Sequence, residues 1–181
     1  MLTLADIDAA AAAGLLAAYG LQLALVADGD EIPGSYWGAP EAGLIGSTVH
    51  ARDDTPVHSL LHEAAHLIVL PPGQRHAVHT DATDSVAEED AVCVLQVLLA
   101  DALPGVGRDR LLADMDAWGY SFRLGSARAY VENDAVTAWT WLQARHLVDG
   151  QQRLVLPPAS RPTKPPTLHA PGPATPGALP A

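Results

Sequence analysis

One short stretch, residues 57–70, constrains the fold more than any other part of this 181-residue chain. It reads Val-His-Ser-Leu-Leu-His-Glu-Ala-Ala-His-Leu-Ile-Val-Leu and is followed by Pro71-Pro72-Gly73. Thr55 can cap the N-terminus of a helix here, and Pro56 fits its first position. Apart from two histidines and one glutamate, every residue from Leu60 onward is apolar, which predicts a helix that is buried on all sides.

The polar residues inside this apolar stretch are His62, Glu63 and His66, in the spacing H-E-x-x-H. Residues four apart on an α-helix are offset by about 6 Å along its axis and by about 40° around it, so the two imidazoles can converge on one zinc ion. Glu63 lies about 100° round from His62, close enough to take a proton from water without being a ligand. Burying these three groups without partners costs several kcal/mol, and a metal removes that cost.

A catalytic zinc usually takes three protein ligands and leaves one position for water. The strongest candidate for the third ligand is the acidic run at residues 88–90, near the start of the next apolar stretch. Glu88 and Glu89 both stay open, because Ser85 and Glu88 form a capping-box pattern that would direct the Glu88 side chain to the backbone and leave Glu89 as the ligand. The remaining candidates are His79, Asp81 and Asp90.

This combination of motifs resembles the zincin metallopeptidases of the gluzincin type, and more narrowly it is similar to the ImmA/IrrE family. In that family a strand leads into the H-E-x-x-H helix, and a later helix carries Glu in an E-x-x-A-N-x-F-A-x-x-L-L-like run. Here the run reads Glu-Glu-Asp-Ala-Val-Cys-Val-Leu-Gln-Val-Leu-Leu from residue 88, so the resemblance places Glu88 at the ligand position. Val92 departs from the family pattern, and so does Ala65 before the second histidine. The resemblance covers roughly residues 43–103 and implies a metallopeptidase fold.

The pattern of the whole chain predicts an α+β fold, with a small sheet packed on the buried H-E-x-x-H helix and a mostly helical C-terminal half. Strands are expected at 21–26 and 43–51, the second offering a free edge to an extended peptide. Helices are expected at 3–19, 85–102, 108–118 and from Ser126 to about 149. The domain covers residues 1–150, and the proline-rich segment 151–181 is expected to be a disordered tail.

The charge of the chain limits the classes of partner that it can bind, and its cysteine content indicates a cellular compartment. The chain carries a net charge of −11, and residues 1–150 hold 7 basic and 21 acidic groups, or −14. A domain this acidic is a poor partner for nucleic acid or for an anionic membrane. Cys93 is the one cysteine, so we expect the reducing cytoplasm. Apolar runs stay below 18 residues, so we expect no transmembrane helix. The N-terminus carries Asp6 and Asp8 where a signal peptide would have a basic region.

These observations predict a zinc-dependent hydrolase of peptide bonds, a metalloprotease with one Zn²⁺ per chain, acting on a protein or peptide substrate. The alternative is a non-catalytic zincin-like domain that binds zinc and acts in protein interaction or regulation. A fourth protein ligand, such as His79 or Asp81, would favour that alternative. A third reading is hydrolysis of a small non-peptide amide or ester. Candidate donors to the reaction's oxyanion are His79, Tyr120, Arg123 and Tyr130, while His58 and Cys93 are read as buried packing residues.

Overall fold

A computed structural model describes residues 1–83 and 85–157, so the predicted tail lies outside the described residues from 158 onward. The described chain is an α+β protein with one three-stranded sheet. In chain order the elements are α1 (Ala9–Ala18), β1 (Gln22–Leu25), β2 (Gly43–Ile45), β3 (Thr48–Ala51), α2 (Val57–Val69), α3 (Val86–Asp101), α4 (Arg108–Trp118), α5 (Ala127–Asn133) and α6 (Val136–Ala144), with 3₁₀ helices at Leu4–Asp6 and Pro72–Ala77. None of the described helices combines the length and the apolar character that a membrane span requires.

The segment expected as a single strand over 43–51 is instead a tight hairpin. β2 and β3 pair antiparallel with Gly43 opposite His50, and β1 pairs parallel with β3, which gives the order β1-β3-β2. Gly46 in the connecting turn has φ of 61°, a conformation that glycine adopts at no steric cost. β3 is therefore the central strand and has no free edge.

The outer edge of β2 is also occupied, contrary to the expectation that this region offers a free edge to a peptide. The Leu44 N–H donates to the Gly34 carbonyl at 3.1 Å, and the Leu44 carbonyl accepts from the Thr80 N–H at 3.0 Å. A Cβ added at Gly43 would lie 2.3 Å from the Pro33 carbonyl oxygen, so this close approach needs glycine. The loop over 32–40 is thereby held against the sheet.

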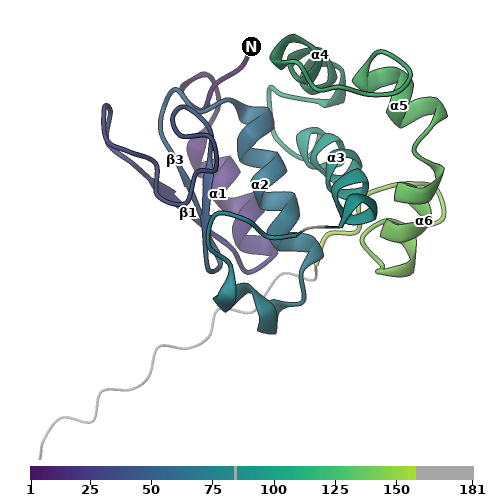
Figure 1. The fold of residues 1–181 in the computed structure, drawn as a ribbon, viewed down its shortest axis with the longest axis horizontal. Helices are drawn as coiled ribbons and strands as arrows, with labels where there is room; N and C mark the ends of the chain where they lie inside the picture. Colours follow the sequence, from purple (N-terminus) through teal and green to yellow (C-terminus); the bar gives the residue numbers. More distant parts are fainter. Residues whose placement is uncertain (84, 158–181) are drawn as a thin grey trace, which may run out of the picture.

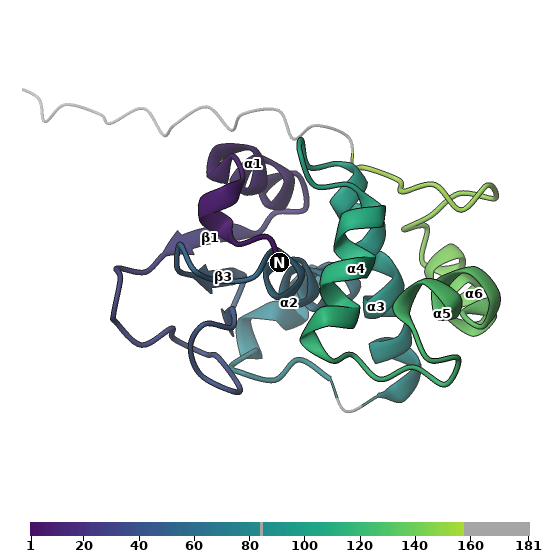
Figure 2. The same ribbon diagram turned by 90° about the horizontal axis from the view of Figure 1, so that it is seen from above.

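Helix α2 lies between the sheet and α3 in two perpendicular views (Figures 1 and 2). It contacts β3 on one side and α3 and α4 on the other. Its N-cap is Pro56 rather than Thr55, whose hydroxyl accepts a hydrogen bond from the Arg52 N–H. The helix is also not buried all round, since His62 and Glu63 are only half-buried. These two residues mark the strip of the helix that faces a cavity.

The C-terminal half is helical, with one break that the sequence pattern did not predict. Ser85 caps α3 as expected, and α4 ends at Gly119 with φ of 106°. The long helix expected from Ser126 is divided at Asp134 and Ala135 into α5 and α6. Helix α3 packs against α2, α4 and α6 and forms the centre of this half.

The chain still contacts the domain just after residue 150, where the boundary was expected. Val148 and Leu154 form an isolated antiparallel bridge, and the Val155 N–H donates to the Leu147 carbonyl at 2.9 Å. Leu154 is half-buried and packs against the core. Residues 151–157, which the composition assigns to the tail, therefore remain in contact with the domain.

Candidate metal centre

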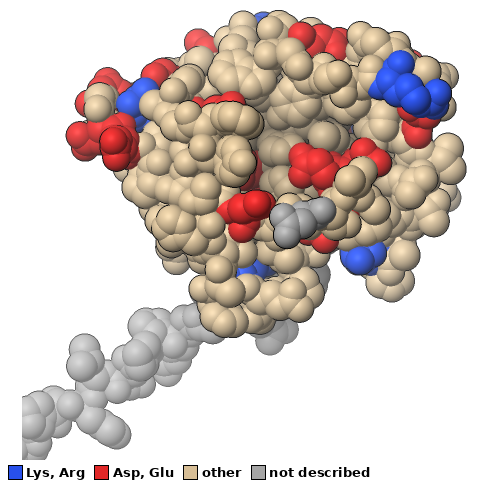
Figure 3. Space-filling view, viewed as in Figure 1, with Lys and Arg blue, Asp and Glu red and all other residues tan. Residues whose placement is uncertain are grey.

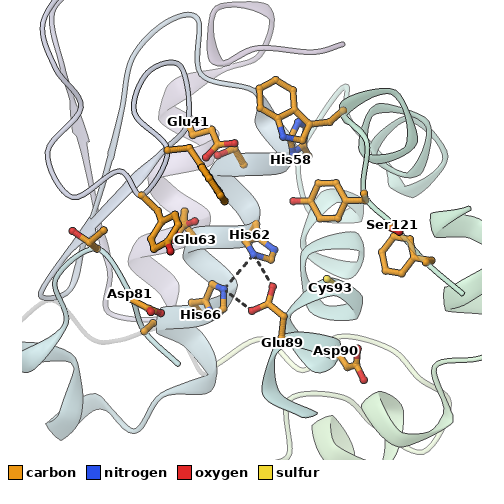
Figure 4. Close-up of a pocket in the computed structure, with 18 residues that line it drawn as sticks. Glu41, His58, His62, Glu63, His66, Asp81, Glu89, Asp90, Cys93 and Ser121 are labelled. Carbon is orange, nitrogen blue, oxygen red and sulfur yellow. Dashed lines mark hydrogen bonds and ion pairs between the residues drawn. The ribbon is translucent and has the colours of Figure 1, made fainter. Parts of the chain in front are cut away.

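His62, His66 and Glu89 converge at the interface of α2 and α3 (Figure 4). The Nε2 atoms of His62 and His66 are 3.2 Å apart. Glu89 places Oε1 3.1 Å from the His62 Nε2 and Oε2 3.2 Å from the His66 Nε2. The potential ligand atoms of the three residues all lie within 4.8 Å of one another, so this group could hold a metal ion.

The carboxylate in this cluster belongs to Glu89, and the first choice from the sequence, Glu88, lies elsewhere. Glu88 lines a different cavity, together with Val69 and Arg145. The capping argument is correct about Ser85, whose hydroxyl accepts the Glu88 N–H at 3.4 Å. Consecutive helical residues point about 100° apart, so only one of the two glutamates can face the histidines.

Fully buried alanines at positions 64, 65 and 91 lie on the two helices that carry the cluster. Small side chains at a helix interface allow the two backbones to approach closely, as α2 and α3 do here. The carboxylate of Glu89 can then reach across to a pair of imidazoles on the neighbouring helix. Helix geometry alone places the two histidines side by side, whereas the packing of α2 against α3 brings Glu89 to them.

No assignment of protons satisfies the three short contacts at once. A ring nitrogen offers either one N–H or one lone pair, yet each Nε2 has two close neighbours in the cluster. If both rings donate to Glu89, the two N–H groups face each other at 3.2 Å without a bond. A cation among the three residues would accept a lone pair from each of them. The geometry therefore matches a cation site better than a closed hydrogen-bonded cluster.

The charges of the cluster follow from its position between two helices. Hydrogen bonds from His62 and His66 hold the pKa of Glu89 far below its usual range, although burial opposes this. Burial lowers the pKa of His62 more than the bond to Glu89 raises it. For His66 burial acts in the same direction, but the hydrogen bond to Glu89 and the charge of Glu63 outweigh it and raise the pKa. The carboxylate is thus ionised and available as a ligand.

Glu63 lies beside the cluster and is not a member of it. It lines the same cavity as His62 and His66 (Figure 4). Burial raises its pKa to about 7, and the charges of Glu89, Glu41 and Asp81 raise it further while His66 lowers it. A carboxyl group with a pKa near neutrality can both accept and return a proton, as general acid–base chemistry requires.

The cavity at this centre has a volume of about 550 Å³. It opens on the face of the molecule in Figure 3, where acidic side chains lie around a hollow and the arginines of this view lie away from it. Its lining includes five acidic residues, and the described residues that line it include neither Lys nor Arg. These acidic residues are Glu41, Glu63, Asp81, Glu89 and Asp90. A volume of this size is typical of a ligand or substrate site.

Of the four candidate oxyanion donors, Tyr120 is the one that lines the cavity. Its ring centroid is 6.0 Å from that of His62, and burial raises the pKa of its hydroxyl, which stays protonated as a donor. The Tyr130 hydroxyl donates to the Asp90 carbonyl, and Arg123 pairs with Asp134. His79 contacts the Thr80 hydroxyl at 2.9 Å and does not line the cavity.

Glu41 and Trp118 line the cavity although the sequence pattern indicated no role for them, and Cys93, expected as a buried packing residue, lines it as well. Glu41 precedes β2, and Trp118 is the last residue of α4. The two residues are too far apart in the chain for sequence spacing to predict that they lie close together. The position of Cys93 could have been predicted, because it lies one turn after Glu89 on α3 and so faces the same way. Its thiol is buried, and burial raises its pKa well above the usual value.

His58 is buried, as the sequence suggested, but it borders the same cavity. It is 1% exposed, and neither ring nitrogen has a hydrogen-bond partner in the described part of the chain. Its ring packs against Trp118 and Tyr120, with centroids 5.2 and 5.6 Å away. Burial lowers its pKa to about 4, so the ring is neutral at pH 7.

A buried neutral histidine makes stability depend on pH. The unfolded chain binds a proton at His58 near pH 6.5, whereas the native protein binds it only near pH 4. The free energy of unfolding should therefore fall as the pH drops from 6.5 towards 4, by at most about 3 kcal/mol from this residue. We expect His58→Phe to reduce this fall. Urea unfolding at pH 7 and pH 5, with both proteins free of metal, measures it, and equal falls in the two proteins would contradict the assignment.

No protein-family model, curated protein or solved structure matches the chain. The resemblance to the ImmA/IrrE family therefore rests on the residues of the motif, and the function is inferred from the geometry of this centre.

Proposed function

We propose that the protein is a zinc-dependent peptidase of minimal zincin-like fold. The observation that carries this proposal is the convergence of His62, His66 and Glu89 beside Glu63 in one cavity. Two histidines and one glutamate, with a further glutamate next to the first histidine, form a known ligand set of catalytic zinc in peptidases. The strand-to-helix order of β3 and α2 is the one that the resemblance implies, although the ligand on α3 is Glu89 and not Glu88, the position that the resemblance gives.

The separation of the two imidazole nitrogens supports a metal of the size of zinc. Zinc binds nitrogen and carboxylate oxygen at about 2.0–2.2 Å, so two donors at tetrahedral positions lie about 3.3 Å apart. The two imidazole Nε2 atoms are 3.2 Å apart, close to this value, and each lies 3.1–3.2 Å from a different oxygen of Glu89. Magnesium and calcium prefer sets of six or more oxygen ligands, which two imidazoles do not provide.

The side chains around the centre supply the remaining chemistry. Zinc, when bound, would act as a Lewis acid that lowers the pKa of a water towards neutrality. Glu63 then accepts the proton of that water and returns it to the leaving amine, which needs a pKa close to the working pH. The Tyr120 hydroxyl is the donor assigned to the oxyanion, since it lines the cavity and keeps its proton.

The alternative of a non-catalytic zinc domain would be favoured by a fourth protein ligand. Within the described residues the cluster consists of His62, His66 and Glu89, and the two residues considered as closing ligands, His79 and Asp81, do not belong to it. Asp81 accepts a hydrogen bond from the Thr83 N–H and lines the cavity. A cluster of three protein ligands beside a large cavity leaves room for a water and a substrate, and this supports the catalytic reading.

Removing and restoring the metal tests the proposal directly. We expect purified protein to cleave peptides in a mixed library, to lose this activity when a chelator removes the metal, and to regain it with one equivalent of zinc. Mass spectrometry of the library before and after incubation measures cleavage. Zinc bound at about one per chain without any cleavage, under conditions where the protein is folded, would favour the non-catalytic alternative.

A further inference from the structure

We infer that the cavity receives a basic side chain of its substrate, Lys or Arg, at a subsite formed by Glu41, His58 and Trp118. This inference rests on the proposed function, because it names the substrate class of the same centre. Its support comes from the distribution of charge, from unpartnered groups in the cavity wall and from the aromatic residues beside them.

The charge of the cavity remains negative even with a metal bound. Its lining holds five carboxyl groups and, among described residues, neither Lys nor Arg. A divalent ion offsets two of the five charges, and His58 is neutral because burial lowers its pKa. With a divalent ion bound, carboxyl groups still outnumber cations in the lining, and a cation is the group that they attract most strongly.

Among the described residues, three carboxylates that line the cavity form no ion pair with a basic side chain. Elsewhere on the described surface, arginine side chains pair with carboxylates, and these arginines are Arg52, Arg108, Arg110, Arg123, Arg128 and Arg153. Glu41, Asp81 and Asp90 take part in no ion pair within the described residues. These three carboxylates are therefore free to pair with a substrate cation.

Glu41 is the carboxylate best placed to select the side chain. It lies in the cavity wall at the same end as His58 (Figure 4), and both residues contact Trp118. Burial raises the pKa of Glu41, which means that its charged form is poorly solvated there. A substrate cation would stabilise that charge, and Coulomb attraction is stronger where water is partly excluded.

His58 points independently to a ligand that donates N–H groups. Its ring is 1% exposed and borders the cavity, and both nitrogens lack a partner in the described chain. A buried imidazole without a hydrogen bond is costly, and a ligand donor that the ring turns to meet would satisfy its unprotonated nitrogen. Ammonium and guanidinium groups carry three and five N–H donors, and neither offers an acceptor.

The aromatic residues of the cavity complete the match to a long basic side chain. Trp118 is 38% exposed, and Tyr36 and Trp37, on the loop held against β2, are 64% and 79% exposed. All three line the cavity. The methylene stem of Lys or Arg packs well on aromatic rings, and its cation interacts favourably with their faces.

Peptide binding to inactive protein tests the inference apart from catalysis. The probe is a set of alanine hexapeptides that differ at one central residue: Lys, Arg, norleucine or Glu. Zinc-loaded Glu63→Gln protein is titrated with each by calorimetry. We expect the Lys and Arg peptides to bind at least about tenfold more tightly than the norleucine peptide, which has a stem of similar length and no charge. The Glu peptide should bind most weakly.

A second variant tests whether Glu41 is responsible for the preference for basic peptides. Glu41→Gln in the same background should reduce the preference for basic peptides to about twofold, whereas Glu31→Gln, an exposed acidic residue outside the cavity, should leave it unchanged. Equal affinities for the Lys and norleucine peptides, or no measurable binding of any peptide, would overturn the inference. Retained selectivity in Glu41→Gln would overturn the assignment of the subsite. Zinc-dependent cleavage of neutral peptides would leave the proposed function standing in either case.

Discussion

Zinc content should distinguish Glu89 from its neighbour Glu88. Wild-type protein is expected to bind about one zinc per chain, and Glu89→Gln should bind it at least about 100-fold more weakly, because a neutral amide replaces one of three ligands. His66→Ala should bind little zinc for the same reason. Atomic emission gives the stoichiometry, and competition with a chromophoric chelator gives the affinity.

Glu88→Gln is the matched control for this experiment. The two glutamates are adjacent on α3, and the change removes one negative charge in both cases. The Ser85 cap should survive both substitutions, since it uses the backbone N–H of Glu88 and not its side chain. Loss of zinc in Glu88→Gln with retention in Glu89→Gln would contradict the geometry. No zinc uptake by the wild-type protein would contradict the metal centre itself.

Glu63→Gln should abolish most of the turnover while leaving the metal in place. Glutamine is close in shape to glutamate but cannot accept a proton from water, so kcat on any peptide cleaved by the wild type should fall about 10²- to 10⁴-fold. Zinc content should stay at the wild-type level, because Glu63 is not part of the ligand cluster. Initial rates on one purified peptide, followed by chromatography, measure this effect.

Two further measurements keep the Glu63 result interpretable. The melting temperature of Glu63→Gln should be equal to or above that of the wild type at pH 8, since burial disfavours the ionised carboxylate and the neutral amide avoids that cost. If turnover and zinc content fell together, Glu63 would be acting on the site's structure and not on the proton. Unchanged turnover with normal zinc content would remove Glu63 from the mechanism.

The charge of the whole chain and the charge of the cavity have different meanings. A net charge of −11 argues against nucleic acid as a partner, but it says nothing about where the charge lies. The structure shows that several acidic residues are neutralised by arginines away from the cavity, while Glu41, Asp81 and Asp90 line it without such partners. Attraction of a basic substrate is thus a local property that an overall count cannot reveal.

Short-range rules were enough for the features that depend on a few neighbouring residues. The convergence of His62 and His66 follows from the pitch of an α-helix, and the end of α4 follows from Gly119. The same rules failed where a local preference was weak. The segment 43–51 turns at Gly46, and the helix expected from Ser126 is divided near Asp134.

The sequence by itself determined which helix carries the centre, which two histidines face the same way and which glutamate lies beside them. Only the tertiary structure decided between Glu88 and Glu89, because the choice depends on how α3 is rotated about its axis when it packs on α2. It also brought Glu41 and Trp118, far apart in the chain, to one end of the cavity. The physical reason is that helical periodicity fixes relations within one element, whereas relations between elements follow from burying their apolar faces together.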